Sequence, residues 1–306
     1  MPTLDTHTAF EAYERMRHRF LQADFQKTSL NVERLETLFE EADGFFLDAF
    51  GVLNVGNGAI EGAKMFIAAL REAKKPFFIL SNSASLPKSE LMLFFKQIGF
   101  IFEPSEIITS REVLWHYFKP ESQTSWGVIA PHLHTLEHSF LHTFHTQEAF
   151  WESDGFLFLG SASWSESFQK RWIDSLHVKP KPIWIANPDI SAPRGQGVYS
   201  KEPGFYTLLS EEALFTHMHF IGKPFSEIFE YALSRAKREW GIDKERIVMV
   251  GDTLHTDILG GCAAGVQTLL VEGYGFFAEQ KVDMFIENSG IVPHFRLKNY
   301  EILFDT

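Results

Sequence analysis

The chain has 306 residues, 45% of them hydrophobic and 22% charged, which predicts a soluble globular protein with one large domain or two smaller ones. The 28 basic and 40 acidic residues give a net charge of −12, which disfavours binding to nucleic acid or to anionic membranes. No apolar run reaches the roughly 18 residues of a membrane span, and the single cysteine, Cys262, excludes an intrachain disulfide. We therefore expect a cytoplasmic protein.

The first 120 residues predict alternating helices and strands. Apolar residues recur at helical spacing over residues 8–22, which indicates an amphipathic helix that packs on the core. The expected helices lie at 8–22, about 31–42, 61–73, 86–99 and 110–118, and the expected strands at 44–47 and 77–80. The two strands and the helix between them form a βαβ unit, which favours a right-handed crossover between parallel neighbours.

Both strands of this unit end in polar residues. Asp48 follows the first apolar run, and Ser81 follows the second. Because the carboxyl ends of parallel neighbours meet at one edge of a sheet, where ligands bind in open α/β sheets, we expect these two residues to lie together. A buried Asp needs a cation, a metal or N–H donors, although an Asx-turn that closes the strand is the alternative for Asp48.

A polar break at about residues 119–125 indicates a domain boundary. Beyond it, strands are expected at 126–130, 155–159 and 182–186, with a helix at 165–176. We therefore predict an inserted domain at 121–215 within a core domain formed by 1–120 and 216–306, with an N-terminal helical extension at about 1–43.

The predicted insertion contains a group of histidines. His134, His138 and His142 have the i, i+4 spacing of one helix face, and such a face can bind a metal. Metal sites usually need a further ligand and an orienting second shell, so an exposed polar helix face is the commoner outcome.

The last third of the chain supplies a lysine and two more carboxylates. Lys223 stands between a glycine and a proline in a tight loop before an expected helix, where a solvated loop lysine is the alternative interpretation. The apolar run 247–251 ends in Asp252, and Asp257 follows it closely. A second strand therefore delivers acidic residues to an edge, as the Asp48 strand does.

Four segments resemble, in this order, the four motifs of the haloacid dehalogenase (HAD) superfamily. They are the strand that ends at Asp48, the strand that ends at Ser81, the loop that carries Lys223 and the strand that ends at Asp252. The sequence GDTLHTDI at 251–258 and the segment Asn187-Pro188-Asp189 resemble its class IIA branch, which is NagD-like or 4-nitrophenyl phosphatase-like. The resemblance covers roughly residues 44–275. It implies an α/β fold with a Rossmann-like core, whose parallel sheet has helices on both faces, and it implies that the insertion is an α/β type 2 cap that covers the site.

The resemblance also implies a Mg²⁺-dependent phosphatase that hydrolyses a small phosphorylated metabolite through an aspartyl-phosphate on Asp48. Mg²⁺ prefers oxygen ligands and is typically held by carboxylates together with the substrate phosphate. The implied ligands are Asp48, Asp252, Asp257 and the backbone carbonyl of Phe50.

The implied phosphate and substrate contacts come from three segments. Ser81 and Lys223 would act with Asp48 as catalytic residues, and the backbone N–H groups of Asn82 and Ser83, expected at a helix start, would bind phosphate. In the cap, Asn187 and Asp189 are expected to face the substrate, although a turn formed by the Asn-Pro-Asp sequence is the alternative.

The chain departs from the family pattern at Phe50. Hydrolytic members generally carry a second Asp at this position as general acid and base, and a phenylalanine cannot transfer a proton. General acid–base catalysis typically contributes roughly 10²–10⁴-fold. We therefore expect activity that is slow or restricted to good leaving groups, unless His255 or Asp189 supplies the proton.

Two other functional classes stay open beside the phosphatase. One is a catalytically weak member of the family that binds a phosphorylated ligand or a protein partner. The other is a different chemistry on the same Asp, or a nucleotide-binding oxidoreductase. Against the oxidoreductase, this chain lacks the G-x-G-x-x-G sequence that such an enzyme is expected to carry after the first strand. A homodimer formed through the cap is left open.

Overall fold

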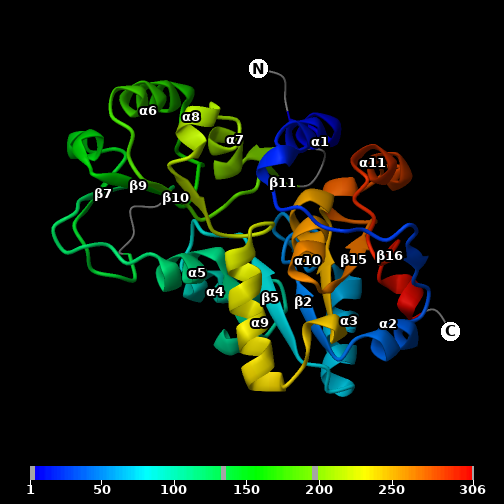
Figure 1. Cartoon of the computed structure of the whole chain (residues 1–306). Coiled ribbons are helices and arrows are strands. Elements are labelled where there is room, and N and C mark those ends of the chain that lie inside the picture. Colours follow the sequence, from blue (N-terminus) through cyan, green and yellow to red (C-terminus); the bar gives the residue numbers. More distant parts are fainter. Residues whose placement is uncertain (1–3, 132–135, 195–198, 305–306) are drawn as a thin grey trace.

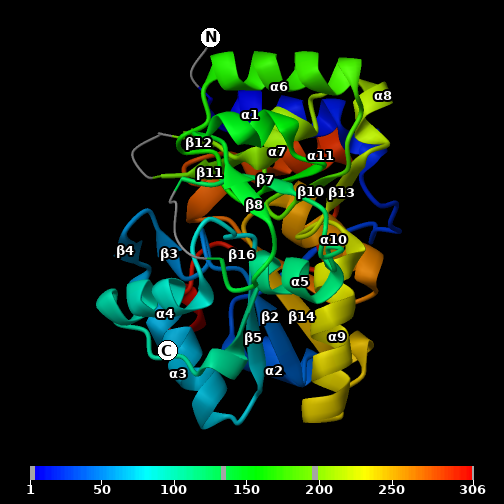
Figure 2. The same cartoon turned by 90° about the vertical axis from the view of Figure 1, so that its left-hand side faces the viewer.

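The computed structural model describes residues 4–131, 136–194 and 199–304, which form two parallel sheets, each with its own helices (Figure 1). The larger sheet and its helices occupy the lower right of Figure 1, and the smaller sheet lies at the upper left. Figure 2, turned by 90°, shows the smaller part stacked on top of the larger one. The predicted α/β class with a Rossmann-like core is confirmed.

The larger sheet has seven strands in the order β1-β16-β15-β14-β2-β5-β6, and every pairing is parallel. Three neighbouring strands of this sheet contain only buried residues: β14 (Ile247–Gly251), β2 (Gly44–Leu47) and β5 (Phe77–Ser81). The outer strands are β1 (Leu30–Asn31), β16 (Phe295–Leu297), β15 (Gln267–Val271) and β6 (Ile107–Thr109). Short, wholly apolar runs suit this sheet because helices cover both of its faces.

The side chains of β2 alternate between two core clusters. Phe45 and Leu47 pack with α2 (Leu35–Glu41), α3 (Glu61–Glu72) and α4 (Lys88–Gln97). Phe46 packs with α5 (Ser110–Tyr117) and α9 (Ser226–Trp240) on the other face. Two further helices, α10 (Leu259–Ala264) and α11 (Val282–Ser289), complete this part. This alternation is the two-residue period of a strand buried on both faces.

The smaller sheet has the order β13-β10-β9-β7-β8 and is also parallel throughout. Its strands are β7 (Trp126–Ile129), β8 (His142–Phe144), β9 (Gly155–Phe158), β10 (Ile183–Ile185) and β13 (Met218–Phe220). Its helices are α6 (Glu166–Val178), α7 (Pro203–Thr207) and α8 (Glu212–Phe215). Because β13 pairs with β10, this sheet extends to Phe220, beyond the predicted boundary at residue 215.

Two hairpins lie near the junction of the two parts. The pairs are β11 (Ser191–Pro193) with β12 (Tyr199–Lys201), and β3 (Asn54–Val55) with β4 (Gly58–Ala59). The N-terminal helix α1 (Thr6–Arg15) and the 3₁₀ turn after it (Arg17–Arg19) also lie there. The amphipathic helix predicted at 8–22 is therefore shorter than expected, although its apolar face is buried as predicted.

Tertiary pairing overrides two other predicted helices. The helix expected at 31–42 begins only at Leu35, because residues 30–31 pair with β16. The helix that would align the histidines is wrong: residues 136–141 are not helical, and His142 begins β8, which pairs with β7. His134 lies outside the described residues, so nothing supports the i, i+4 metal site.

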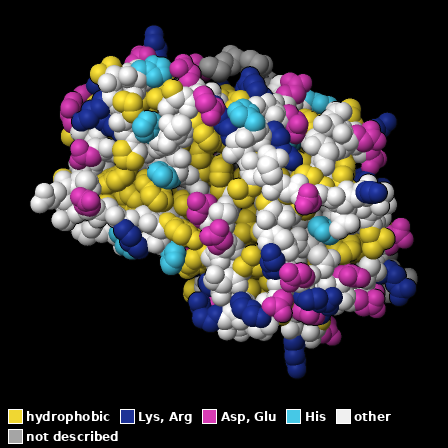
Figure 3. All heavy atoms as spheres, in the orientation of Figure 1, with side chains coloured by type: hydrophobic (Ala, Val, Ile, Leu, Met, Phe, Trp, Pro, Cys, Tyr) yellow, Lys and Arg dark blue, Asp and Glu magenta, His cyan; other side chains and the backbone are white. Residues whose placement is uncertain are grey.

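Figure 3 shows one face of the molecular surface. On the face shown in Figure 3, acidic and basic side chains are interspersed, and hydrophobic side chains gather mainly on the left, over the smaller sheet. Among the residues that the structure describes, no helix combines the length and the hydropathy that crossing a membrane would require.

Candidate active site

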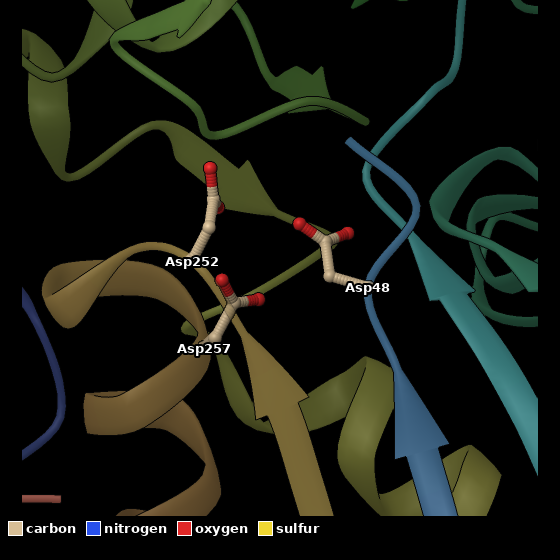
Figure 4. Close-up of side chains that lie close together, drawn as sticks. All are labelled: Asp48, Asp252 and Asp257. Carbon is tan, nitrogen blue, oxygen red and sulfur yellow. The ribbon is translucent and has the colours of Figure 1, made fainter. Parts of the chain in front are cut away.

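The register of the central strands brings the predicted residues to one edge of the larger sheet. β2 pairs in parallel with β14 on one side and with β5 on the other, so Asp48, Ser81 and Asp252 lie at neighbouring strand ends. Asp257 comes from the helical turn Leu254–Ile258 that follows β14. Figure 4 shows the carboxylates of Asp48, Asp252 and Asp257 directed toward one another.

Lys223 lies between two of these carboxylates. Its Nζ is 2.5 Å from Asp48 Oδ1 and 2.7 Å from Asp257 Oδ1, and the residue is 1% exposed. Burial by itself lowers the pKa of Lys223, but the attraction of the two carboxylates outweighs it and holds that pKa above its usual value. Lys223 is therefore a charged, buried group, and the solvated loop lysine is the wrong interpretation.

The negative charge at this edge exceeds the charge of the lysine. One oxygen from each of Asp48, Asp252 and Asp257 lies within 4.8 Å of the others. Burial raises the pKa of Asp48 to about 7; Lys223 opposes this rise and Asp257 adds to it. Burial, together with repulsion from Asp257 and Asp48, also raises the pKa of Asp252 well above its usual value. An all-oxygen set with excess negative charge fits a divalent cation.

A backbone N–H and a side-chain hydroxyl hold Asp252 in place. Its Oδ2 accepts the Phe276 N–H at 2.7 Å, and its Oδ1 accepts the Thr253 hydroxyl at 2.9 Å. Gly51 and Gly275 have positive φ values of 76° and 64°. A Cβ on either would lie 2.0 or 1.9 Å from Asp252 Oδ2, so only glycine permits this close approach.

The side chain of Asn82 links three segments. Its Nδ2 donates to Asp189 Oδ1 at 2.8 Å and to the Lys223 carbonyl at 2.9 Å, and its Oδ1 accepts the Lys223 N–H at 2.8 Å. Asn82 therefore connects three parts of the chain: the loop after β5, to which it belongs (the strand-end loop), the loop that carries Lys223 (the lysine loop) and the insertion. The predicted helix start at Asn82 and Ser83 is wrong, because a loop follows β5 and α4 begins at Lys88.

A cavity of about 250 Å³ lies between the sheet edge and the insertion. Six of the residues predicted to contact substrate line it: Asp48, Ser81, Asn82, Ser83, Asn187 and Asp189. Lys223 is not among the lining residues, although it contacts Asp48. Apolar side chains line it as well: Phe50, Leu86, Leu91, Phe94 and Leu159. His255 is not among the lining residues; it is fully buried, and its Nε2 lies 2.5 Å from Glu14 Oε1. His255 is therefore wrong as a substitute proton donor.

Two charged lining residues have no counterpart in the sequence-based prediction. Arg194 and Glu202, beside the β11–β12 hairpin, form an ion pair of 2.7 Å. Glu202 Oε2 also accepts the Asn187 Nδ2 at 3.2 Å, and the Arg194 guanidinium lies 5.5 Å from the centre of the Phe50 ring. The only sequence signal is a pair of opposite charges flanking a short hairpin, which does not indicate that they reach the cavity.

Asp189 has an unusual protonation state for a carboxyl group in the cavity wall. Burial raises the pKa of Asp189 to about 8, and the hydrogen bond from Asn82 lowers it only in part. The side chain is therefore mostly neutral at pH 7. A neutral carboxyl can donate a proton, which Phe50 cannot.

Two family descriptions match the parts of the sequence that build the larger sheet. Residues 45–138 match "Haloacid dehalogenase-like hydrolase", and residues 220–296 match a second HAD hydrolase-like family. The matches leave residues 139–219 between them, which contain most of the smaller sheet.

Curated relatives extend over most of the chain. The acid sugar phosphatase of Staphylococcus haemolyticus is 27% identical over 236 residues, which cover 75% of this chain and 84% of that protein. The acid sugar phosphatase of Staphylococcus aureus is 25% identical over 262 residues, which cover 83% and 94%.

Solved structures share the fold over nearly their whole length. A possible sugar phosphatase of the HAD superfamily from Cytophaga hutchinsonii superposes with a TM-score of 0.77 at 23% identity, covering 89% of this chain and 99% of that one. The 4-nitrophenylphosphatase of Thermotoga maritima superposes with a TM-score of 0.65 at 21% identity, covering 87% of this chain and 97% of that one. NagD from Escherichia coli gives 0.61 at 21% identity, covering 87% and 98%.

We expect Asp189→Asn to change the pH dependence of stability. The folded parent keeps a proton on Asp189 up to about pH 8, whereas the unfolded chain releases it near the ordinary value of 3.8. The contribution of this proton to the free energy of unfolding is present at low pH and is lost as pH rises through about 8. The amide of Asp189→Asn does not titrate, so the variant has no such loss. In chelator-treated protein, Tm of the variant relative to the parent should therefore increase from pH 5 to pH 8, by about 2–4 °C for each kcal/mol. Parallel curves of Tm against pH would contradict this.

Proposed function

The chain belongs to the haloacid dehalogenase-like hydrolases, and on that premise we propose that it is a Mg²⁺-dependent phosphatase of small phosphate monoesters. The main support is the buried lysine that contacts Asp48 and Asp257 beside a third carboxylate. This arrangement combines an anionic nucleophile, a fixed positive charge and a set of oxygen ligands, and Asp48 connects it to the cavity that it lines. The relatives named acid sugar phosphatases support the same reaction class.

Asp48, Asp252 and Asp257 would hold the metal ion. Their clustered oxygens and the raised pKa values of Asp48 and Asp252 indicate that this edge lacks positive charge. Mg²⁺ bound there would neutralise carboxylate charge and stabilise the charge that develops on the phosphoryl group. The backbone carbonyl of Phe50 is a further ligand in this proposal. The all-oxygen donor set favours Mg²⁺ over softer metals.

Ser81 and Lys223 would bind the phosphate oxygens. Ser81 lines the cavity beside Asp48, and the Ser83 N–H donates to its hydroxyl oxygen at 3.2 Å. That hydrogen bond leaves the Ser81 hydroxyl proton free to point at a phosphate. The ammonium of Lys223 is already held by two ion pairs, so it needs little reorganisation when the phosphate arrives.

The reaction would proceed in two steps at Asp48. A carboxylate oxygen attacks phosphorus while the bond to the leaving oxygen breaks, which gives an aspartyl-phosphate and frees the alcohol. Water then attacks the same phosphorus, the bond to Asp48 breaks, and phosphate and the free carboxylate are released. The leaving oxygen gains a proton in the first step and the water loses one in the second, so both steps benefit from a proton-transfer group.

The Phe50 side chain lines the cavity without providing that group. Asp189 is the remaining candidate of the two that the sequence suggested, because it lines the same cavity and its pKa is raised to about 8. If Asp189 does not serve the reaction, proton transfer depends on water and on the leaving group. Because the Phe50 side chain provides no proton-transfer group, a second function is also favoured. In it, the protein is catalytically weak and binds a phosphorylated ligand in the same cavity.

Asp48→Asn should abolish turnover while the fold is kept, because the amide preserves the shape of the side chain but is not an anionic nucleophile. We expect kcat to fall by on the order of 10³-fold or more. Phosphate release from a panel of esters with millimolar Mg²⁺ measures it, with Asp174→Asn on the exposed face of α6 as the matched control. Parental activity in purified Asp48→Asn would end the aspartyl-phosphate proposal.

Millimolar Mg²⁺ should raise the Tm of the parent, and Asp252→Ala should remove the effect. A ligand that binds only the folded state stabilises it by RT ln(1 + [L]/Kd), or about 2.7 kcal/mol when its concentration is one hundred times Kd. Differential scanning fluorimetry with and without metal measures the shift, with Asp174→Ala as the control. A parent that shows no shift, or an Asp252→Ala variant that keeps it, speaks against the metal site.

The rate should depend steeply on leaving-group acidity, because Phe50 cannot protonate the departing oxygen. We expect aryl phosphates with acidic phenols to react at least ~10²-fold faster than alkyl phosphates, and Phe50→Asp to narrow this difference. Rapid-quench kinetics on substituted phenyl phosphates and one alkyl phosphate measure the slope. A shallow slope in the parent that becomes steep in Asp189→Asn would instead identify Asp189 as the proton donor.

A further inference from the structure

The N-terminal helix α1 contacts the active-site loops and the insertion at the same time. In Figure 1 it lies at the top of the molecule, between the helices of the insertion and α11. Its buried face belongs to a core cluster that also contains Leu254 and Phe276 from loops of the larger sheet and Ile190 and Leu208 from the insertion. The helix therefore packs across the junction between the two parts.

Tyr13 makes the most direct of these connections. Its ring, 1% exposed, stacks on the His255 ring with a centroid distance of 5.0 Å and an interplanar angle of 9°. His255 belongs to the turn that carries Asp257. The Tyr13 hydroxyl oxygen accepts the backbone N–H of Ile190 at 3.0 Å, and Ile190 directly follows Asp189. One side chain thus joins the carboxylate loop to the segment of the insertion that lines the cavity.

Further contacts of α1 hold Tyr13 in this place. The Thr6 hydroxyl donates to the Phe276 carbonyl at 3.3 Å and lies 2.6 Å from the Tyr199 hydroxyl on β12. The Phe276 residue is the one whose N–H supports Asp252. Glu14 adds its contact with His255 Nε2. The helix is consequently attached to both loops that support the carboxylates as well as to the insertion.

The turn after α1 continues along the insertion. Arg19 pairs with Glu212 on α8 at 2.9 Å, donates to the Leu208 carbonyl, and places its guanidinium 4.5 Å from the centre of the Phe215 ring. Phe20 then contacts Phe225, beside the lysine loop, at 6.0 Å between ring centres. Residues 6–20 therefore cross the junction as one segment that contacts both the larger part and the insertion.

We propose that Tyr13 is a positioning residue that holds the segment Asn187–Ile190 in register over Asp48, so that a phosphate ester is bound from both sides of the cavity. The inference rests on the proposed phosphatase function. Asn82 holds the same segment from the other side, through Asp189. The phosphate would contact the sheet edge, whereas the alcohol part would contact the segment that Tyr13 holds. Loss of the Tyr13 hydroxyl should therefore weaken binding of the ester more than binding of free phosphate.

The kinetic test compares Tyr13→Phe with Tyr231→Phe. The first change keeps the stacked ring and removes only the acceptor of the Ile190 N–H; the second removes a hydroxyl that donates to Glu112 at 3.2 Å within the larger part. With Tyr13→Phe we expect KM for an aryl phosphate to rise about five- to tenfold, the size of one lost hydrogen bond. The inhibition constant of inorganic phosphate should stay within twofold, and Tyr231→Phe should change neither. An unchanged KM, or an equal loss for phosphate, overturns the proposal.

Amide hydrogen exchange supplies a readout that does not need turnover. With Tyr13→Phe we expect faster exchange at several amides of residues 187–193, not at Ile190 alone, because the whole segment loses its register. Tyr231→Phe should exchange there as the parent does. Acceleration confined to Ile190 would show a local bond with no positioning role. If the parent hydrolyses no ester, the proposed phosphatase fails, and the exchange measurement still decides whether Tyr13 holds the segment.

Discussion

A single buried ammonium has to compensate a group of buried carboxylates, and the rest of the site depends on this constraint. Lys223 contacts Asp48 and Asp257 directly, and Asp252 lies close to both carboxylates. Breaking a buried ion pair by removing one partner typically costs about 3–5 kcal/mol, because the remaining charge has lost its solvent. Even with the lysine in place, burial keeps the pKa of Asp48 at about 7. The arrangement is therefore stable as folded and still attracts further positive charge.

The surrounding backbone is shaped to bring these charges so close. Gly51 and Gly275 approach Asp252 to distances that exclude any Cβ, and the N–H of Phe276 neutralises part of its charge. Asn82 uses three hydrogen bonds to fix the lysine loop against the strand-end loop and the insertion. The same residues that satisfy buried polar groups thus define the distance between the sheet edge and the insertion. The contacts that stabilise these buried groups therefore also set the geometry of the candidate site.

The cavity combines two kinds of wall. Ion-paired and amide side chains of the insertion form a polar wall, while Phe50 and leucines form an apolar side. The two walls meet where the Arg194 guanidinium lies 5.5 Å from the centre of the Phe50 ring. Under the proposed function, we expect the segment Asn187–Ile190 and the adjoining hairpin β11–β12 to contact the alcohol part of a substrate. Residues 6–20 matter because they tie this hairpin and the adjoining segment to the larger part.

The sequence alone determined the fold class and the residues at the sheet edge. Apolar runs that end in Asp48, Ser81 and Asp252 specify parallel strands, and parallel strands necessarily deliver their final residues to one edge. Only the tertiary structure decided what depends on contacts between distant segments. Pairing with β7 turned the predicted histidine helix into a strand at His142, and a loop replaced the helix start expected at Asn82. The contacts of Tyr13 with His255 and Ile190 span more than 170 residues and leave no local pattern. Periodicity reports which face of an element is buried, whereas the partner that buries it is set by the packing of the whole chain.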